Sequence, residues 1–186
     1  MDRTTTASTA TTPTTPTTPT TATPTTPTRR VFAMMDRDGD GVISADDYLS
    51  RIDRVVKATG RTEDDPLVAT ARAKGLKAWG VMDANADGRL TFEEYDAWVD
   101  GEKFDTICQY ALGSLFDLVD ADGDGALDRA EFTTLRTALN NPPGNAEAAF
   151  GALDTDGDGR VARGAYLAAI RAYVVGDSSP MGEVLY

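Results

Sequence analysis

Apolar side chains recur in step at four places along the chain, each time just before a short acidic segment. An aromatic residue lies four positions before the first Asp of each segment, and another apolar residue lies one position before it. The four pairs are Phe32 and Met35, Trp79 and Met82, Phe116 and Val119, and Phe150 and Leu153. Residues three apart share one face of a helix, so each acidic segment is predicted to follow an amphipathic helix.

A second helix is predicted after each acidic segment, because an aromatic residue follows all four of them: Tyr48, Tyr95, Phe132 and Tyr166. Pro66 suits the first turn of one helix, and Asp105 is expected to cap another. The predicted helices span residues 30–36, 45–58, 67–82, 92–99, 106–119, 129–139, 146–153 and 163–175.

The repeating unit is therefore a helix, a loop and a helix, and it occurs four times. An apolar residue lies in the middle of every loop, and we expect Ile43 to pair with Leu90 and Leu127 to pair with Val161. The predicted fold is all-α, with four repeats in two pairs, short β-bridges between paired loops, and one compact domain. The first pair is assigned to residues 29–100 and the second to residues 101–175.

The chain ends differ from the repeats in composition. Residues 1–28 are rich in Thr and Pro and offer little to bury, so a disordered tail is predicted. This tail would serve as a flexible tether or, on an exported protein, as an O-glycosylated stalk. Residues 176–186 are assigned to a C-terminal tail.

The overall charge and the rare side chains exclude several classes of function. The net charge is −12, from 30 acidic and 18 basic residues, which argues against nucleic acid as a partner. The chain has no His and one Cys, Cys108, which excludes zinc sites and Cys-His catalysis. We expect Cys108 to be a small core residue. No catalytic constellation is recognisable, so the chain is predicted not to be an enzyme.

The hydropathy of the chain bears on its location. No apolar run approaches the roughly 20 residues of a membrane span. The N-terminus lacks the apolar core of a secretory signal, and a cytoplasmic location is predicted.

The four acidic segments share the pattern D-x-[D/N]-x-D-G, and they begin at Asp36, Asp83, Asp120 and Asp154. Calcium takes six to eight oxygen ligands, which a twelve-residue loop supplies from positions 1, 3, 5, 7 and 12, with Gly at position 6 for the turn. Two loops match throughout. The second offers Asp83, Asn85, Asp87, the Arg89 carbonyl and Glu94, and the third offers Asp120, Asp122, Asp124, the Ala126 carbonyl and Glu131.

The first and fourth loops depart from the pattern at position 12. The first offers Asp36, Asp38, Asp40, the Val42 carbonyl and Asp47. Because Asp47 is one methylene shorter than Glu, either the loop contracts or Asp47 ligates through one oxygen. Since one-oxygen ligation gives six ligands, a site that takes calcium or magnesium is predicted.

The fourth loop has Asp154, Asp156, Asp158 and the Arg160 carbonyl, but Ala165 replaces the carboxylate. We expect a structural repeat that has lost its ion, or else a weak site used at high calcium. About three calcium sites are therefore predicted for the whole chain, in loops one to three.

These motifs resemble those of EF-hand proteins, and more narrowly the calerythrin and sarcoplasmic calcium-binding protein group. The resemblance covers roughly residues 30–175 and includes a degenerate loop, a long first connection and Asp47 closing the first loop. It implies a compact four-EF-hand fold and a role as a calcium buffer or signal modulator. The Thr/Pro-rich tail is not part of that family pattern.

Two roles remain open on the sequence. The acidic loops and the few methionines favour a cytosolic calcium buffer, because target-binding grooves are typically rich in Met. The alternative is a calcium-dependent sensor that binds a helix of a target protein, for which Trp79, Trp98, Phe116 and Phe132 supply aromatic flanks.

Overall fold

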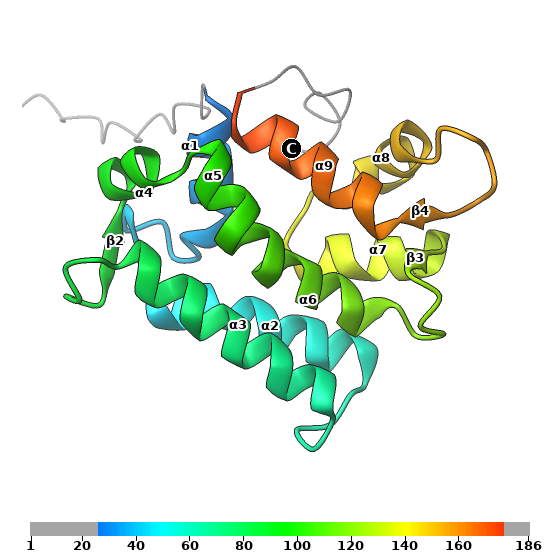
Figure 1. The fold of residues 1–186 in the computed structure, drawn as a ribbon, viewed down its shortest axis with the longest axis horizontal. Coiled ribbons are helices and arrows are strands. Elements are labelled where there is room, and N and C mark those ends of the chain that lie inside the picture. The colour runs from blue at the N-terminus through cyan, green and yellow to red at the C-terminus, as the bar shows by residue number, and fades with distance from the viewer. Residues whose placement is uncertain (1–25, 177–186) are drawn as a thin grey trace, which may run out of the picture.

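A computed structural model describes residues 26–176 of the chain, and it is mostly helical (Figure 1). Its helices are α1 Pro27–Met35, α2 Ala45–Thr59, α3 Pro66–Met82, α4 Phe92–Trp98, α5 Gly101–Lys103, α6 Gln109–Val119, α7 Arg129–Ala138, α8 Ala146–Leu153 and α9 Arg163–Val174. Its strands are β1 Val42–Ser44, β2 Arg89–Thr91, β3 Ala126–Leu127 and β4 Val161–Ala162. The predicted all-α fold of four helix–loop–helix repeats is confirmed.

Short antiparallel strands join the loops in two pairs, as predicted. Ile43 pairs with Leu90 between β1 and β2, and Leu127 pairs with Val161 between β3 and β4. All four side chains are fully buried. Each bridge therefore fixes two loops side by side and places one apolar residue from each loop in the interior.

The first helix begins earlier than expected, at Pro27 instead of residue 30. The Thr26 hydroxyl accepts a hydrogen bond from the Arg29 N–H at 3.2 Å and caps the helix. Proline suits the first helical turn, where its missing N–H leaves no hydrogen bond unmade. The remainder of the predicted N-terminal tail, residues 1–25, and residues 177–186 of the C-terminal tail lie outside the described residues.

The helix that leads into the third loop also begins earlier than predicted, and Asp105 does not cap it. The cap is Asp100, whose carboxylate accepts a hydrogen bond from the Lys103 N–H at 2.8 Å. One wider π turn, Phe104–Cys108, connects α5 to α6. Asp105 lies inside this turn and instead accepts from Arg171 Nε of α9 at 2.7 Å.

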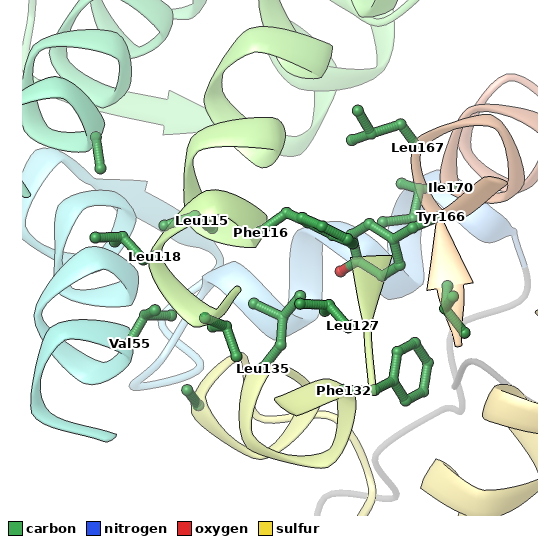
Figure 2. Packing of buried hydrophobic residues seen from close by; sticks show 14 of the residues in the cluster. Val55, Leu115, Phe116, Leu118, Leu127, Phe132, Leu135, Tyr166, Leu167 and Ile170 are labelled. Carbon is green, nitrogen blue, oxygen red and sulfur yellow. The ribbon is translucent and has the colours of Figure 1, made fainter. Parts of the chain in front are cut away.

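The core is built from rings and branched side chains of both pairs (Figure 2). The Phe116 and Tyr166 rings lie 5.6 Å apart, and the Phe132 and Tyr166 rings 6.2 Å apart. Val55 of α2 belongs to the same buried cluster, so the interior of the second pair extends to the first. Cys108 packs against both buried clusters, as expected for a small core residue. Burial raises the pKa of its thiol to about 12.

The two pairs pack face to face. Helix α3 lies along α6, α2 contacts α7, and α1 contacts α9 (Figure 1). The apolar face of each pair therefore covers that of the other. Within residues 26–176, none of the helices combines the length and the apolar character needed to cross a membrane.

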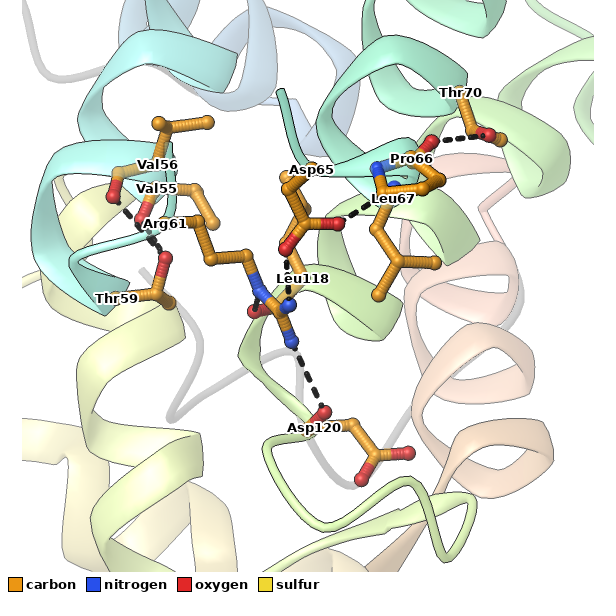
Figure 3. Close-up of polar contacts among 10 residues, drawn as sticks. All are labelled: Val55, Val56, Thr59, Arg61, Asp65, Pro66, Leu67, Thr70, Leu118 and Asp120. Atoms are coloured by element: carbon orange, nitrogen blue, oxygen red, sulfur yellow. Dashed lines mark hydrogen bonds and ion pairs between the residues drawn. The ribbon is translucent and has the colours of Figure 1, made fainter. Parts of the chain in front are cut away.

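Arginines of the first pair satisfy carbonyl groups at the helix ends of the second pair. Arg61 Nε donates to the Leu118 carbonyl at 2.7 Å, and Nη2 lies 3.5 Å from the Asp120 carbonyl (Figure 3). Arg61 Nη1 also pairs with Asp65 at 2.6 Å. Arg54 Nε donates to the Ala138 carbonyl at 2.7 Å. Cations at these positions complement the partial negative charge of a helix C-terminus.

Candidate metal centre

The backbone of each loop wraps around the carboxylate of its first Asp. One oxygen of this side chain accepts the N–H of the glycine at position 6. The distances are 3.0 Å from Asp36 to Gly41, 3.0 Å from Asp83 to Gly88, 2.9 Å from Asp120 to Gly125 and 3.1 Å from Asp154 to Gly159. These glycines have φ between 77° and 86°, a left-handed conformation that disfavours other residues. The predicted role of Gly at position 6 therefore matches the local geometry.

The position 5 side chains hold the backbone at position 7, where a carbonyl ligand is predicted. Each position 5 carboxylate accepts the N–H of the position 7 residue. The distances are 2.9 Å from Asp40 to Val42, 2.9 Å from Asp87 to Arg89, 2.9 Å from Asp124 to Ala126 and 2.8 Å from Asp158 to Arg160. Val42, Arg89 and Ala126 begin β1, β2 and β3, whereas Arg160 directly precedes β4.

Carboxylate oxygens gather within 4.8 Å of one another in three of the loops. The groups are Asp36, Asp38 and Asp40; Asp120, Asp122 and Glu131; and Asp154, Asp156 and Asp158. Oxygen donors of this kind suit hard divalent cations such as calcium and magnesium. The predicted ligands at positions 1 and 3 thus lie together in the first, third and fourth loops.

The third loop closes across its whole length. Glu131, at the start of α7, accepts the Ala121 N–H through one oxygen at 2.8 Å. Its other oxygen accepts the Asp128 N–H at 2.9 Å. The side chain therefore reaches back to the loop entrance while it caps the following helix, which explains its place among the clustered carboxylates.

The second loop is held together by an amide. Asn85 Nδ2 donates to Asp87 at 3.0 Å and to Glu94 at 2.9 Å. Glu94 also accepts the Thr91 N–H at 2.9 Å, so it caps α4. The amide hydrogens lie between the two carboxylates, where they relieve the charge repulsion that a bound cation would otherwise relieve.

In the first loop, the carboxylate at position 12 does not reach back to the beginning of the loop. Asp47 accepts the Ser44 N–H at 3.1 Å and the Ser44 hydroxyl at 2.6 Å. The shorter side chain caps α2 in this way, but it is not part of the group formed by Asp36, Asp38 and Asp40. The structure therefore brings three of the five predicted ligands of this loop close together, Asp36, Asp38 and Asp40, and leaves Asp47 at the helix cap.

The fourth loop lacks both the cap and the closing carboxylate. Ala162 precedes α9 with no side-chain cap, and Ala165 stands at position 12. Asp154 Oδ1 is buried and has no hydrogen-bond partner among residues 26–176, unlike its counterpart in the first loop, where Asp36 Oδ1 accepts the Gly39 N–H at 2.9 Å. A buried carboxylate oxygen without a partner fits a cation ligand, although few other oxygens support one here.

A contact between the third and fourth loops was not foreseen from the sequence. Arg160, at position 7 of the fourth loop, forms an ion pair with Asp124, a predicted ligand of the third loop. Arg163 of α9 likewise pairs with Asp117 of α6 at 2.7 Å. The sequence signal for this contact was an arginine in a loop that lacks its closing carboxylate. The sequence did not show where the Arg160 side chain points, because that depends on the pairing of β3 with β4.

Two EF-hand family models match the chain. The EF-hand domain pair model matches residues 109–170, and the EF hand model matches residues 28–50 and 80–99. Together these segments cover more than half of the chain and contain all four loops.

Several proteins of similar sequence or structure are described by their names as calcium-binding proteins. Calerythrin from Saccharopolyspora erythraea is 26% identical, with 80% of this chain and 90% of calerythrin covered. The probable calcium-binding protein CML17 from Oryza sativa subsp. japonica is 29% identical, with 72% and 84% covered. A calcium-binding protein of Streptomyces coelicolor, solved to explain prokaryotic calcium-mediated regulation, superposes with a TM-score of 0.69 at 27% identity, with 82% and 98% covered.

A match to an enzyme is limited to part of that enzyme. Calcium-dependent protein kinase 33 from Arabidopsis thaliana is 28% identical, but the match covers only 23% of the kinase. The loops, their pairing and these relatives together identify the chain as a calcium-binding EF-hand protein of the calerythrin and sarcoplasmic calcium-binding protein type.

Proposed function

We propose that the loops beginning at Asp36, Asp83 and Asp120 bind calcium and that the protein is a cytoplasmic calcium buffer. The observation that carries the buffer role is the burial of the two apolar faces against each other, with α3 along α6 and α2 against α7. A sensor must open such a face to bind its target helix, whereas a buffer needs no such opening.

The predicted ligands of the second and third loops support two calcium sites. Glu94 and Glu131 both connect the end of the loop to its beginning, through Asn85 and through the Ala121 N–H. A carboxylate in this place can offer two oxygens to the ion. The remaining ligands proposed here are Asp83, Asp87 and the Arg89 carbonyl in the second loop, and Asp120, Asp122, Asp124 and the Ala126 carbonyl in the third.

The first loop is proposed to hold either calcium or magnesium. Its ligands would be Asp36, Asp38, Asp40, the Val42 carbonyl and one oxygen of Asp47. Because Asp47 is one methylene shorter than Glu94 and Glu131 and does not join the other carboxylates of its loop, we expect it to ligate through one oxygen, and magnesium prefers the resulting six-coordinate arrangement.

The fourth loop is proposed as a structural repeat that has lost its ion, and the alternative is a weak site that fills only at high calcium. Asp154, Asp156, Asp158 and the Arg160 carbonyl offer too few oxygens for tight binding. The loop keeps its structural role, because β4 still pairs with β3.

Calorimetric titration of the calcium-stripped protein tests the site assignments. We expect about three strong sites, since three loops have a carboxylate at position 12. Glu94→Gln and Glu131→Gln are each expected to remove one strong site. The matched control is Glu93→Gln, because Glu93 is exposed and lies beside Glu94 outside the ligand set. Retention of all sites in Glu94→Gln would contradict the assignment of the second loop.

Fluorescence of a hydrophobic dye tests the buffer role. The stripped protein is titrated with calcium over about 1 mM magnesium, which competes for such sites. Unchanged or falling dye fluorescence, with binding followed by Trp emission, is expected for a buffer. A strong rise at micromolar calcium would show an opening apolar face and would replace the buffer with the sensor.

An exposed apolar surface favours target binding as the second candidate function. Leu76 is 56% exposed and Tyr110 is 61% exposed on neighbouring helices α3 and α6. Lys74, Lys77 and Tyr110 line a groove there, whose charge suits an acidic partner. A pull-down that recovers the same proteins with and without calcium would count against a calcium-dependent role of this surface.

A further inference from the structure

A cavity of about 90 Å³ lies between the two EF-hand pairs. Its lining comes from α1, α2, α3, α4, the π turn, α6, α7 and α9, and most of these side chains are buried. The cavity lies between the two pairs and is partly open to solvent, and none of its described lining residues belongs to a calcium loop.

The cavity has an unexpected charge for a protein with 30 acidic and 18 basic residues. Among the described residues that line it, two are arginines, Arg51 and Arg136, and none is Asp or Glu. The rest of the lining is largely apolar and includes Met35, Met82 and Ile170. In a chain with an excess of acids, the charged side chains of the described residues around this cavity are therefore both cations.

The partners of Arg51 among the described residues are neutral. Its Nε donates to the Tyr48 carbonyl at 3.1 Å, and its Nη1 lies 3.4 Å from the Met35 sulfur. Its guanidinium carbon lies 4.0 Å from the centre of the Tyr48 ring. In the part of the chain that the structure describes, no carboxylate lies within ion-pair distance of Arg51. A partly buried guanidinium without a counter-ion is stabilised by any anion that can reach it.

Arg136 is held deeper in the same wall. Its side chain is only 2% exposed, and its Nη2 donates to Asn145 Oδ1 at 2.9 Å. Asn145 comes from the segment before α8, so the guanidinium is fixed from outside the cavity. Its positive charge adds to that of Arg51 along the cavity wall, and electrostatic interactions at such a buried side chain are stronger than in water.

The phenol of Tyr166 belongs to the same cavity lining as the two arginines. Burial raises its pKa to about 12, while Arg136 and Arg51 both act to lower that pKa. The phenol therefore keeps its proton at neutral pH and can donate a hydrogen bond. Tyr48, also buried and protonated, offers a second phenol in the same lining.

We propose that this cavity binds a small monocarboxylate, whose carboxylate pairs with Arg51 and whose apolar body lies against Met35, Met82 and Ile170. An engineered cavity of about 150 Å³ takes benzene, so this smaller space suits a carboxylate of about two or three carbons in all. Charge selects the head group, because a neutral or cationic head would leave Arg51 without a counter-ion.

Fluorine NMR on the full calcium-loaded chain tests the proposal with fluoroacetate as the probe. The controls are fluoroacetamide and 2-fluoroethylammonium, which have the same fluoromethyl body and a neutral or cationic head. We expect saturable binding of one carboxylate per chain, at least tenfold tighter than the amide, and no binding of the ammonium compound. Equal affinities for the carboxylate and the amide, or no saturable binding of the carboxylate, would overturn the proposal.

Variants locate the site. Arg51→Gln is expected to weaken carboxylate binding at least tenfold and to leave amide binding unchanged, and Arg51→Lys is expected to retain the preference for the carboxylate. The matched control is Arg72→Gln, because Arg72 makes surface ion pairs with Asp53 and Glu63. Circular dichroism checks that each variant folds. If Arg51→Gln folds and binds the carboxylate as the wild type does, the assignment to this cavity is wrong.

Discussion

Position 4 distinguishes the second loop from the other three. Gly39, Gly123 and Gly157 occupy this position with φ of 72° to 73°, whereas Ala86 occupies it in the second loop with φ of 56°. Alanine in the left-handed region meets a steric cost of roughly 1–2 kcal/mol. The second loop therefore stores strain that the other loops avoid.

Ala86→Gly is expected to stabilise the protein. Relief of the left-handed strain outweighs the extra entropy of glycine in the unfolded chain, for a net gain of about 0.5–1 kcal/mol. Urea unfolding of the calcium-stripped protein measures the change in the free energy of unfolding. Gly88→Ala, at φ of 77°, is the opposite control and should destabilise. A loss of stability in Ala86→Gly would contradict the argument.

The side chain of Arg160 acts on a loop to which it does not belong. It pairs with Asp124, so a fixed positive charge lies beside a proposed calcium ligand of the third loop. Two cations near one carboxylate repel each other, and this repulsion weakens with salt.

Arg160→Gln is therefore expected to raise the calcium affinity of the third loop about three- to tenfold at low salt, an effect on the scale of one nearby surface charge. Calcium titration at two salt concentrations measures it, and the gain should shrink at high salt. Arg72→Gln changes the net charge equally at a remote site and serves as control. An unchanged affinity in Arg160→Gln would show that the ion pair is irrelevant to binding.

At the scale of the elements, the helices that follow the loops show how the residue at position 12 can serve both as a helix cap and as a metal ligand. Ser44, Thr91 and Asp128 cap α2, α4 and α7, and each donates its backbone N–H in return to the carboxylate at position 12. Helix α9 has Ala162 at this place and no such cap. The fourth loop thus lost a helix cap together with its closing ligand.

Ala165→Glu is expected to restore both roles. The new carboxylate can accept the Ala162 N–H and supply the two oxygens that the loop lacks, so calorimetry should detect one additional calcium site. Ala165→Gln is the matched control, because its amide has the same shape and only one ligating oxygen. If Ala165→Glu binds no additional calcium, a missing carboxylate does not explain the weakness of this loop.

Most helices were predictable from local patterns because their ends carry local signals. The periodic apolar positions and the Asp of each loop set the limits of α8, for example, at the predicted residues 146–153. The start at Gly101 was missed because Asp100 and Asp105 both suit a cap. Only the tertiary pairing of Asp105 with Arg171 decides between them.

At the scale of the whole molecule, Arg61 couples the two pairs. It joins Asp65, which caps α3, to the carbonyls of Leu118 and Asp120 at the entrance of the third loop (Figure 3). The hydrogen bond from Arg61 lowers the pKa of Asp65 below its ordinary value of 3.8, and the Leu67 N–H lowers it further. A charge on Asp65 thus supports contacts that end at a proposed calcium ligand.

Arg61→Gln is expected to raise the pKa of Asp65 toward its ordinary value and to lower the stability of the protein. A lowered native pKa stabilises the fold above the unfolded pKa, and this contribution is lost as the pH falls through the native pKa. NMR titration of the Asp65 carboxyl measures the shift, and thermal unfolding near neutral pH measures the stability. Arg72→Gln controls for loss of a surface arginine. An unchanged Asp65 titration would contradict the role given to Arg61.

The sequence predicted which loops are joined by β-bridges better than it predicted how the two EF-hand pairs pack against each other. Ile43 and Leu90 carry their own apolar signal at matching loop positions, so their bridge was foreseen. The contact of Arg54 with the Ala138 carbonyl involves residues from different pairs that share no periodic pattern. The positions proposed as ligands were found from spacing alone, whereas the Asp124–Arg160 contact required the relative placement of two loops.

The π turn at Phe104–Cys108 determines how this part of the chain tolerates deletions. One residue turns an α-helix by about 100°, so removal of one residue here would leave a regular helix with its two halves rotated against each other. Phe104 and Phe116, 1% and 0% exposed, could then no longer both face the interior. Thr106 is exposed within this turn and should be readily replaced by another residue. Deletion of Thr106 should instead destabilise the fold, because every residue before it in the helix would turn to a different face.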